Sequence, residues 1–292
     1  MHLRHVADGL PRKLDDPGTG ASPFKIAEGE TMLGIDLTGR KALVTGGARG
    51  IGAGVVRALA QSGAQVAFTY LGSDRGTDAA GQLSAELNEQ EERVFGFVAP
   101  AQDLEAMEKV ALDAAARMGG LDILVPNAGT GFVAPLEELE LSGWQRILDI
   151  NLTGQFIAVK VALPKLLEAD RADVVLIGSS GVLDGGGGGV HYTSSKAGLE
   201  GLMRGMMRER LPSRGVHVNI VHPCVVDTDL LRTRYDTEEK RAQLAAQVPV
   251  GRLSRPMDIG ALIAFLCSDL GGFICGQSIH VDGGRLLWRE RR

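Results

Sequence analysis

Short apolar segments alternate with longer segments of helical periodicity from residue 41 onward, and this alternation restricts the possible folds more than any other feature of the sequence. A strand, a crossover helix and a second strand form a βαβ unit, which places both strands parallel in one sheet. The apolar runs predict strands at 42–45, 65–70, 93–98, 123–126, 174–178, 216–221 and 278–281. Apolar residues spaced three and four apart predict helices at 51–62, 77–91, 103–118, 142–168, 190–211, 238–247 and 256–268.

The repeated unit predicts an α/β protein with a Rossmann fold, that is, a doubly wound, seven-stranded parallel sheet with helices on both faces. The apolar runs contain few polar residues, so we expect strands that are buried on both faces. No second block of different composition follows, and we therefore expect one Rossmann-type catalytic domain over residues 32–292. Residues 1–31 mix glycine, proline and charged residues without a period, which predicts a flexible N-terminal extension.

Charge and cysteine content narrow the classes of partner. The net charge is −5 and the acidic and basic residues are interspersed, which argues against a nucleic-acid or anionic membrane partner. The three cysteines, Cys224, Cys267 and Cys275, are odd in number and form no C-x-x-C pair, so we expect buried apolar residues and no disulfide framework or metal site. The N-terminal residues contain no apolar stretch long enough for a signal peptide or a membrane span, and we expect a cytoplasmic protein.

A glycine-rich turn follows the first expected strand and leads directly into the first expected helix. It places Gly46, Gly50 and Gly52 around Arg49, and the helix starts near Ile51. Glycines let the backbone turn tightly and approach a pyrophosphate, while the free N–H groups and the positive dipole at a helix N-terminus favour its charge. The sequence therefore predicts a dinucleotide-binding turn.

The choice of dinucleotide depends on the residues that meet the ribose 2′ position. An acidic residue at the end of the second strand accepts a hydrogen bond from a 2′-hydroxyl, and a cation accommodates a 2′-phosphate. The second expected strand ends in Phe68-Thr69-Tyr70 without an acid, and Asp74 lies a few residues too far along the chain. Arg49 and Arg75 are two cations within reach, so NADP(H) is favoured over NAD(H).

Tyr192 and Lys196 are four residues apart and therefore share one side of an expected helix. A free phenol has a pKa near 10, and a nearby ammonium group lowers this pKa toward the range in which the phenol can transfer protons. Ser179 lies thirteen residues before Tyr192, at the end of a buried strand, where ligands collect in an open α/β sheet. Its hydroxyl can hold a substrate oxygen, and the adjacent Ser180 is the alternative.

Together with the glycine turn, these residues resemble the short-chain dehydrogenase/reductase family from about Gly34 to Gly284. The family's T-G-x-x-x-G-x-G matches Thr45 to Gly52, and its C-terminal V-D-G-G matches Val281 to Gly284. Four further elements of the family pattern are its N-A-G, a helix asparagine, a serine, and Y-x-x-x-K. They match Asn127-Ala128-Gly129, Asn151, Ser179, and Tyr192 with Lys196.

The resemblance implies an NAD(P)-dependent oxidoreductase that interconverts a secondary alcohol and a ketone, with a sugar, a polyol or a 3-oxoacyl compound as substrate. Tyr192 would be the general acid and base, Ser179 would orient the substrate oxygen, Lys196 would hold the ribose, and Asn151 would anchor a water. Pro223, Val226 and Thr228 would also contact the cofactor. The family further implies a homotetramer formed through the helices at 142–168 and 190–211, and a segment at 229–248 that covers the substrate.

Three departures from the family pattern affect the cofactor side. Pro126 replaces an asparagine before N-A-G, and Cys224 replaces the glycine of a P-G turn. Pro100 stands where an aspartate commonly holds adenine, and Gln102 or Asp103 could take over that function.

Other conspicuous residues carry alternative interpretations. His191 points about 100° away from Tyr192 on the helix, so we expect it at the entrance or the surface, and we expect His222 to pack near the cofactor. The five glycines 185–189 indicate either a roomy substrate pocket or a flexible loop. The alternative function is a catalytically silent NADP(H)-binding sensor or scaffold protein.

Overall fold

The computed structural model describes residues 34–89 and 91–287. The expected N-terminal extension over residues 1–31 lies outside the described residues. The residues from Ile35 onward belong to one compact unit.

A seven-stranded sheet forms the centre of that unit, with the strand order β3-β2-β1-β4-β5-β6-β7. Every neighbouring pair is parallel, which confirms the predicted doubly wound α/β fold. The strands are β1 (Lys41–Val44), β2 (Gln65–Tyr70), β3 (Val94–Val98), β4 (Ile123–Val125), β5 (Ala172–Ile177), β6 (Val216–Pro223) and β7 (Ser278–Val281). The order reverses between β1 and β4, and ligands bind in such sheets at the carboxyl ends beside that reversal.

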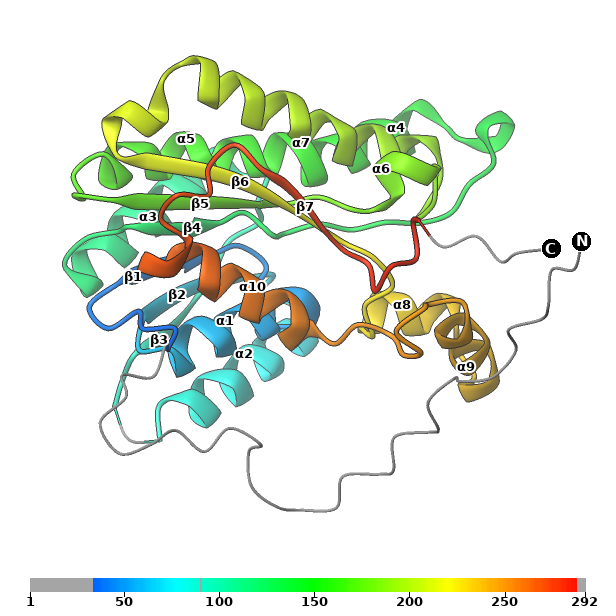
Figure 1. The fold of residues 1–292 in the computed structure, drawn as a ribbon, viewed down its shortest axis with the longest axis horizontal. Helices are drawn as coiled ribbons and strands as arrows, with labels where there is room; N and C mark the ends of the chain where they lie inside the picture. The colour runs from blue at the N-terminus through cyan, green and yellow to red at the C-terminus, as the bar shows by residue number, and fades with distance from the viewer. Residues whose placement is uncertain (1–33, 90, 288–292) are drawn as a thin grey trace, which may run out of the picture. The chain divides into compact units, whose positions relative to one another are not determined.

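Helices cover both faces of the sheet (Figure 1). One face packs against α1 (Gly50–Gln61), α2 (Asp74–Leu87) and α10 (Pro256–Cys267). The other packs against α3 (Leu104–Met118), α5 (Gly154–Leu166) and α7 (Val190–Arg208). The central strands are buried on both faces as expected, but parts of the edge strands β3 and β7 are exposed, because only one neighbouring strand covers each.

The expected helix at 142–168 is divided by a change of helix type. It consists of α4 (Leu141–Leu148), a π-helical turn over Asp149–Thr153, and α5. Within the described part of the chain, the segment Leu141–Leu166 is long and apolar enough to cross a membrane by length and composition. Several of its apolar residues lie in the core between the sheet and the outer helices, and this packing accounts for its composition.

Several short elements complete the fold. They are α6 (Gly181–Asp184), α8 (Asp229–Arg234) and α9 (Glu238–Ala246), together with 3-10 turns at Leu136–Glu138, Leu211–Arg214 and Asp269–Gly271. The expected helix at 238–247 is α9, whereas no separate helix was expected at α8. Thr228 and Thr237 cap α8 and α9 by accepting hydrogen bonds from Leu231 N–H and Lys240 N–H, so these are two independent helices.

Candidate active site

The glycine turn between β1 and α1 is packed so closely that side chains do not fit at several of its positions, among them Gly46 and Gly52. Gly46 has φ +64°, and a Cβ there would lie 2.9 Å from the Cα of Ala128. A Cβ on Gly52 would lie 2.1 Å from the carbonyl oxygen of Gly46. Gly50 also has a positive φ, at +55°. These contacts require glycine, because a Cβ within 3 Å of backbone atoms would force the turn apart.

Residues after β4 hold this turn in place. The Thr45 hydroxyl accepts hydrogen bonds from the N–H groups of Asn127 (2.9 Å) and Ala128 (3.0 Å). The Asn127 side-chain amide donates to the carbonyl oxygens of Thr45 and Gly46. The Gly46 N–H donates to the Thr69 hydroxyl. Asn127 and Gly46 were both expected to contact the cofactor. The Asn127 side-chain amide and the Gly46 N–H are used in hydrogen bonds that stabilise the turn.

The N-terminus of α1 has the features of an anion site. Arg49 is the N-cap residue but its side chain does not cap the helix, and the first turn contains no acidic residue. The first N–H groups of a helix have no partner within the helix, so a phosphate can accept hydrogen bonds from them. Ile51 is half-buried against the core and fixes the start of the helix beneath the turn. The turn therefore fits the pyrophosphate of a dinucleotide.

Arg49 and Arg75 converge on one carboxylate oxygen. Asp229 Oδ2 lies 3.3 Å from a guanidinium nitrogen of Arg49 and 2.8 Å from one of Arg75. All three side chains are substantially exposed, at 43% for Arg49, 67% for Arg75 and 46% for Asp229. The two cations that were expected to reach a 2′-phosphate therefore do lie close together, whereas Asp229 was not anticipated there.

Tyr192 lies in the first turn of α7 with its ring enclosed by glycine backbone. A Cβ on Gly187 would lie 3.0 Å from the ring, and Cβ atoms on Gly131 and Gly188 would lie 3.2 Å and 3.1 Å from Tyr192 side-chain atoms. Gly187 also has φ +100°, a conformation that other residues rarely adopt. The glycine run thus packs over the tyrosine ring, a function that neither interpretation of its sequence had included.

Ser179 follows β5 and its hydroxyl lies next to the Tyr192 phenol. Burial raises the pKa of Tyr192, and a hydrogen bond with Ser179 lowers it only in part. The Ser179 hydroxyl also accepts a hydrogen bond from Gly181 N–H at 3.2 Å. Ser180 is the N-cap residue of α6 and makes no such contact with Tyr192. The geometry thus favours Ser179 over Ser180 as the serine of the site.

Lys196 lies one turn after Tyr192 and is almost completely buried, at 4% exposure. Its ammonium group donates to the carbonyl oxygen of Ile177 at 2.8 Å, and burial lowers its pKa from 10.5 to about 8. Burial is the largest cause of the pKa shift in both groups, and for Tyr192 it acts against the lowering of the pKa that was expected from Lys196.

Asn151 lies in the π-helical turn, and its side chain makes two hydrogen bonds with the backbone of Thr130. Its side-chain oxygen accepts from Thr130 N–H at 2.8 Å, and its side-chain nitrogen donates to the Thr130 carbonyl at 2.9 Å. The same nitrogen donates to the Ser195 hydroxyl, which itself donates to the Tyr192 carbonyl. A Cβ on Gly129 would lie 3.3 Å from Asn151 Oδ1 and 3.5 Å from Lys196 Nζ. Asn151 therefore connects the N-A-G segment with α7.

A buried histidine and a glutamate support Ser179 from behind, and sequence reasoning did not identify this pair. His222 Nδ1 lies 3.0 Å from the backbone nitrogen of Ser179, and Nε2 lies 2.8 Å from Glu200 Oε1. Burial raises the pKa of the Glu200 carboxyl. Hydrogen bonds from Ser278 and His222 outweigh burial and hold this pKa below its usual value. Glu200 follows Lys196 by four residues and so lies on the same side of α7. This helical spacing was the available signal.

The segment after β6 returns to the glycine turn. Pro223 accepts a hydrogen bond from Ser180 N–H, and Cys224 donates its N–H to Val281. Val226 is buried and pairs with Ser254 in an isolated bridge. The methyl group of Thr228 lies 3.4 Å from the position of a Cβ on Gly50. Among these residues, Thr228 lies directly beside the glycine turn.

Two expectations are corrected by the structure. His191 is completely buried, because Phe132 from the segment after β4 packs against it with a distance of 4.4 Å between the ring centroids. Of the cysteines, only Cys267 is fully buried, since Cys224 and Cys275 lie near the exposed edge strand β7. The Asp103 carboxylate, one of the two candidates to replace the adenine-binding aspartate, caps α3 by accepting a hydrogen bond from Ala106 N–H at one of its oxygens.

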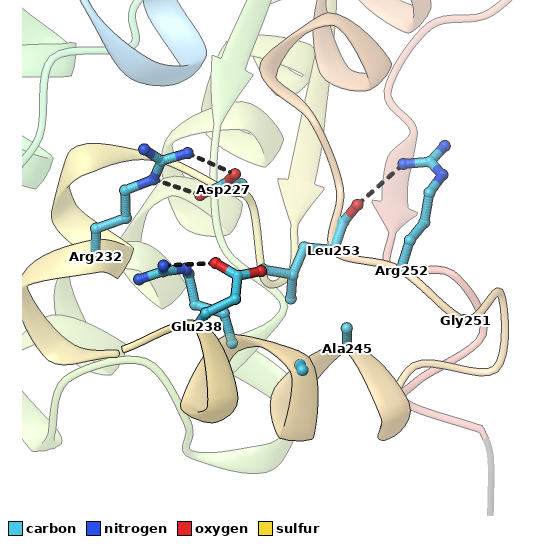
Figure 2. A pocket seen from close by; sticks show the side chains of 9 residues that line it. Asp227, Arg232, Glu238, Ala245, Gly251, Arg252 and Leu253 are labelled. Carbon is cyan, nitrogen blue, oxygen red and sulfur yellow. Dashed lines mark hydrogen bonds and ion pairs between the residues drawn. The ribbon is translucent and has the colours of Figure 1, made fainter. Parts of the chain in front are cut away.

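A cavity of about 390 Å³ lies beside α9 (Figure 2), and Tyr192 is not one of its lining residues. Its lining includes three arginines, each of which is paired with a carboxylate: Arg232 with Asp227, Arg241 with Glu238, and Arg252 with Asp258. Because these cations are neutralised within the protein, the cavity offers no free anion site. Among residues 34–89 and 91–287, no group of three or more His, Cys, Asp or Glu side chains could hold a metal.

Comparison with known proteins gives consistent matches over this unit. A family model described as enoyl-(acyl carrier protein) reductase matches residues 46–285. The 3-oxoacyl-(acyl-carrier-protein) reductase of Escherichia coli (strain K12) is 34% identical over 253 residues, which cover 87% of this chain and 100% of that protein. A dehydrogenase/reductase structure from Sinorhizobium meliloti 1021 is 36% identical, with a TM-score of 0.78, over 86% of this chain and 96% of the other. A blue fluorescent protein from a metagenomic library, solved with NADPH, is 35% identical, with a TM-score of 0.78, over 86% and 99%.

Proposed function

Because the chain belongs to the short-chain dehydrogenase/reductase family and is an NAD(P)-dependent oxidoreductase, we propose that it interconverts a secondary alcohol and a ketone with Tyr192 as general acid and base. The observation that carries this proposal is the gathering of the half-buried Tyr192 with the buried Ser179 and Lys196 in one cluster at the carboxyl end of β5. Such a cluster can hold an oxygen and move a proton away from bulk water.

Each residue of the cluster has a distinct task. Tyr192 gives its phenolic proton to the carbonyl oxygen during reduction and takes it back during oxidation. Ser179 donates a hydrogen bond to the same oxygen and fixes its position. Lys196 carries a positive charge that stabilises the phenolate, and its ammonium group binds ribose hydroxyls. Asn151 holds Thr130 and, through Ser195, the start of α7, and we retain the expectation that it anchors a water.

The turn at Gly46–Gly52 and the uncapped N-terminus of α1 would hold the pyrophosphate of the cofactor, with Thr228 beside the turn. Pro223 and Val226 would also contact the cofactor, as the resemblance implies. When bound, the nicotinamide supplies or accepts the hydride. Arg49 and Arg75 favour NADP(H) over NAD(H), because both guanidinium groups can bind a 2′-phosphate. The relative that was solved with NADPH supports this preference.

Among the substrate classes that the resemblance left open, we favour a 3-oxoacyl compound. The curated relatives are named as 3-oxoacyl reductases. In addition, the segments that flank Tyr192 and Ser179 carry exposed apolar side chains, namely Val133, Leu136 and Leu183. An acyl chain gains free energy from such surface, whereas a sugar does not.

A substrate panel tests this function. NADPH oxidation is followed with acetoacetyl-CoA, a ketose and an open-chain ketone, and the reverse reaction is followed with a polyol. We expect the thioester to give the highest kcat/KM. Binding of NADPH without turnover on any of these compounds would instead favour the silent sensor or scaffold.

We further propose a homotetramer in the cytoplasm. The aromatic side chain of Phe156 on α5 is 46% exposed, on a helix that the family uses for assembly. Multi-angle light scattering of the purified protein gives the mass directly, and a monomer mass would contradict this proposal.

A further inference from the structure

Asp229 occupies the place where the proposed function puts a phosphate. One of its oxygens, Oδ2, contacts both Arg49 (3.3 Å) and Arg75 (2.8 Å). A 2′-phosphate oxygen between two guanidinium groups would make the same kind of charge-assisted contact. The Asp229 carboxylate thus makes the contacts that a 2′-phosphate oxygen would make.

The two possible anions cannot share the site without repulsion. Two guanidinium groups supply two positive charges, and Asp229 already neutralises one of them. A phosphate monoester carries about −1.5 to −2 charges near neutral pH, so adding it beside Asp229 leaves an excess of negative charge. The charge balance therefore favours displacement of the carboxylate by the phosphate.

The position of Asp229 in the fold leaves it free to be displaced. It is the first residue of α8, the short helix that begins directly after Thr228, and its side chain is 46% exposed. Asp227, two residues earlier, instead forms a two-point pair with Arg232 at the cavity beside α9 (Figure 2). The two neighbouring carboxylates thus serve different partners, and only Asp229 faces the glycine turn.

We propose that Asp229 competes with the cofactor's 2′-phosphate for Arg49 and Arg75, and that it thereby sets how strongly the enzyme prefers NADP(H) to NAD(H). NAD(H) has no 2′-phosphate and need not displace Asp229. The carboxylate consequently weakens NADP(H) binding and leaves NAD(H) binding unaffected. This inference rests on the proposed use of Arg49 and Arg75 for the 2′-phosphate.

The test compares Asp229→Asn with the wild type in equilibrium titrations of the full-length protein. NADPH and NADH are titrated by the fluorescence of the bound reduced nicotinamide. Adenosine 2′,5′-bisphosphate and ADP are titrated by calorimetry, because the first carries the 2′-phosphate and neither carries nicotinamide. Asp236→Asn is the matched control, since Asp236 lies just after α8 and is exposed but pairs with Lys240.

We expect Asp229→Asn to bind NADPH roughly fivefold more tightly, a gain of the size that two exposed ion pairs can supply. The affinity for adenosine 2′,5′-bisphosphate should rise by the same factor. The affinities for NADH and ADP should stay within about twofold of the wild type, which is the size of effect that an ordinary surface substitution produces. Asp236→Asn should behave as the wild type. Unchanged or weaker NADPH binding in Asp229→Asn, or an equal gain for NADH, would overturn the inference.

Arg49→Ala separates this inference from the proposed cofactor preference. If Arg49→Ala weakens NADPH binding while Asp229→Asn leaves it unchanged, the cofactor preference stands and only the competition by Asp229 is wrong. If Arg49→Ala changes neither cofactor's affinity and the wild type prefers NADH, both fail together.

Discussion

The two ends of the site hold their charged and polar groups in opposite ways. At the phosphate end, Arg49, Arg75 and Asp229 are exposed, and within residues 34–89 and 91–287 both arginines pair with Asp229. At the catalytic end, Lys196 and Asn151 are buried, and backbone groups fix both of them. Exposed pairs contribute little free energy and are screened by salt, whereas buried polar groups are costly to leave without partners.

This difference indicates which property of the enzyme can change easily. A substitution among the exposed charges alters the balance between two cofactors and leaves the backbone in place. A substitution in the buried cluster removes a partner from groups that have no access to water. We therefore expect large effects on turnover at the catalytic end and small, selective effects on affinity at the phosphate end.

The largest effect should follow from Tyr192→Phe. The loss of the phenolic hydroxyl removes the proton donor, so kcat should fall about 10²- to 10⁴-fold. NADPH affinity, measured by fluorescence titration, should remain close to that of the wild type, because the phosphate end is intact. A variant that retains a tenth of the wild-type kcat would show that Tyr192 is not the acid and base.

Lys196→Met should stabilise the protein while it abolishes most activity. Burial lowers the pKa of the lysine from 10.5 to about 8, so at pH 7 the folded state holds a charge that costs about 3 kcal/mol. Below pH 8 both states are charged, and this cost lowers the free energy of unfolding in full. Between pH 8 and 10.5 the folded lysine is neutral while the unfolded one is still charged. The cost therefore decreases as the pH rises through this range. In the variant, the Ile177 carbonyl loses the Lys196 ammonium group as a donor but still accepts a hydrogen bond from the Gln155 side-chain amide. The substitution therefore does not leave this carbonyl without a partner.

Urea unfolding of wild type and Lys196→Met from pH 7 to 10.5 measures this effect. The stability advantage of the variant should be constant up to about pH 8 and should then shrink steadily toward pH 10.5. Lys160→Met, which removes an exposed lysine from α5, is the control and should show no such trend. A constant difference between Lys196→Met and wild type across the range would rule out the buried charge as its cause.

Gly187→Ala should lower kcat by displacing the Tyr192 ring. Gly187 and Gly185 both have positive φ angles, at +100° and +73°, but only a Cβ on Gly187 would meet the ring. Both alanine variants therefore carry backbone strain, and their difference isolates the contact. We expect Gly187→Ala to lose roughly 10- to 100-fold in kcat relative to Gly185→Ala. Equal kcat values would mean that the loop adjusts without moving the tyrosine.

The smallest effect should be found at the exposed end. Arg75→Ala removes one of two partners of a 2′-phosphate, so the NADPH dissociation constant should rise about threefold to tenfold. The dissociation constant for NADH should not change. Because these charges are exposed, the difference between the two proteins should decrease when the salt concentration is raised from about 0.05 to 0.5 M. A loss that is equal for both cofactors would indicate a structural role for Arg75.

Much of the fold was predictable because each strand is an apolar run and each crossover is a helix. The expected strands at 65–70 and 278–281 coincide with β2 and β7, and the motif spacing brought Ser179 and Tyr192 to one place. What the sequence could not supply were contacts between side chains of distant segments. Asp229 meets Arg49 across 180 positions, and Glu200 meets His222 from another element. Periodicity also cannot reveal a change of helix type, so the turn containing Asn151 was predicted as regular helix.

That π-helical turn has a consequence for how this chain aligns with its relatives. A π-helix closes its hydrogen bonds over one more residue than an α-helix, so side chains after Asp149–Thr153 are rotated by roughly 100° compared with an uninterrupted helix. A relative that lacks one residue there would continue in regular α-helical phase and would present a different side chain to Thr130. A single-residue gap at this point therefore marks a change of active-site architecture, even where the flanking helices align without any other interruption.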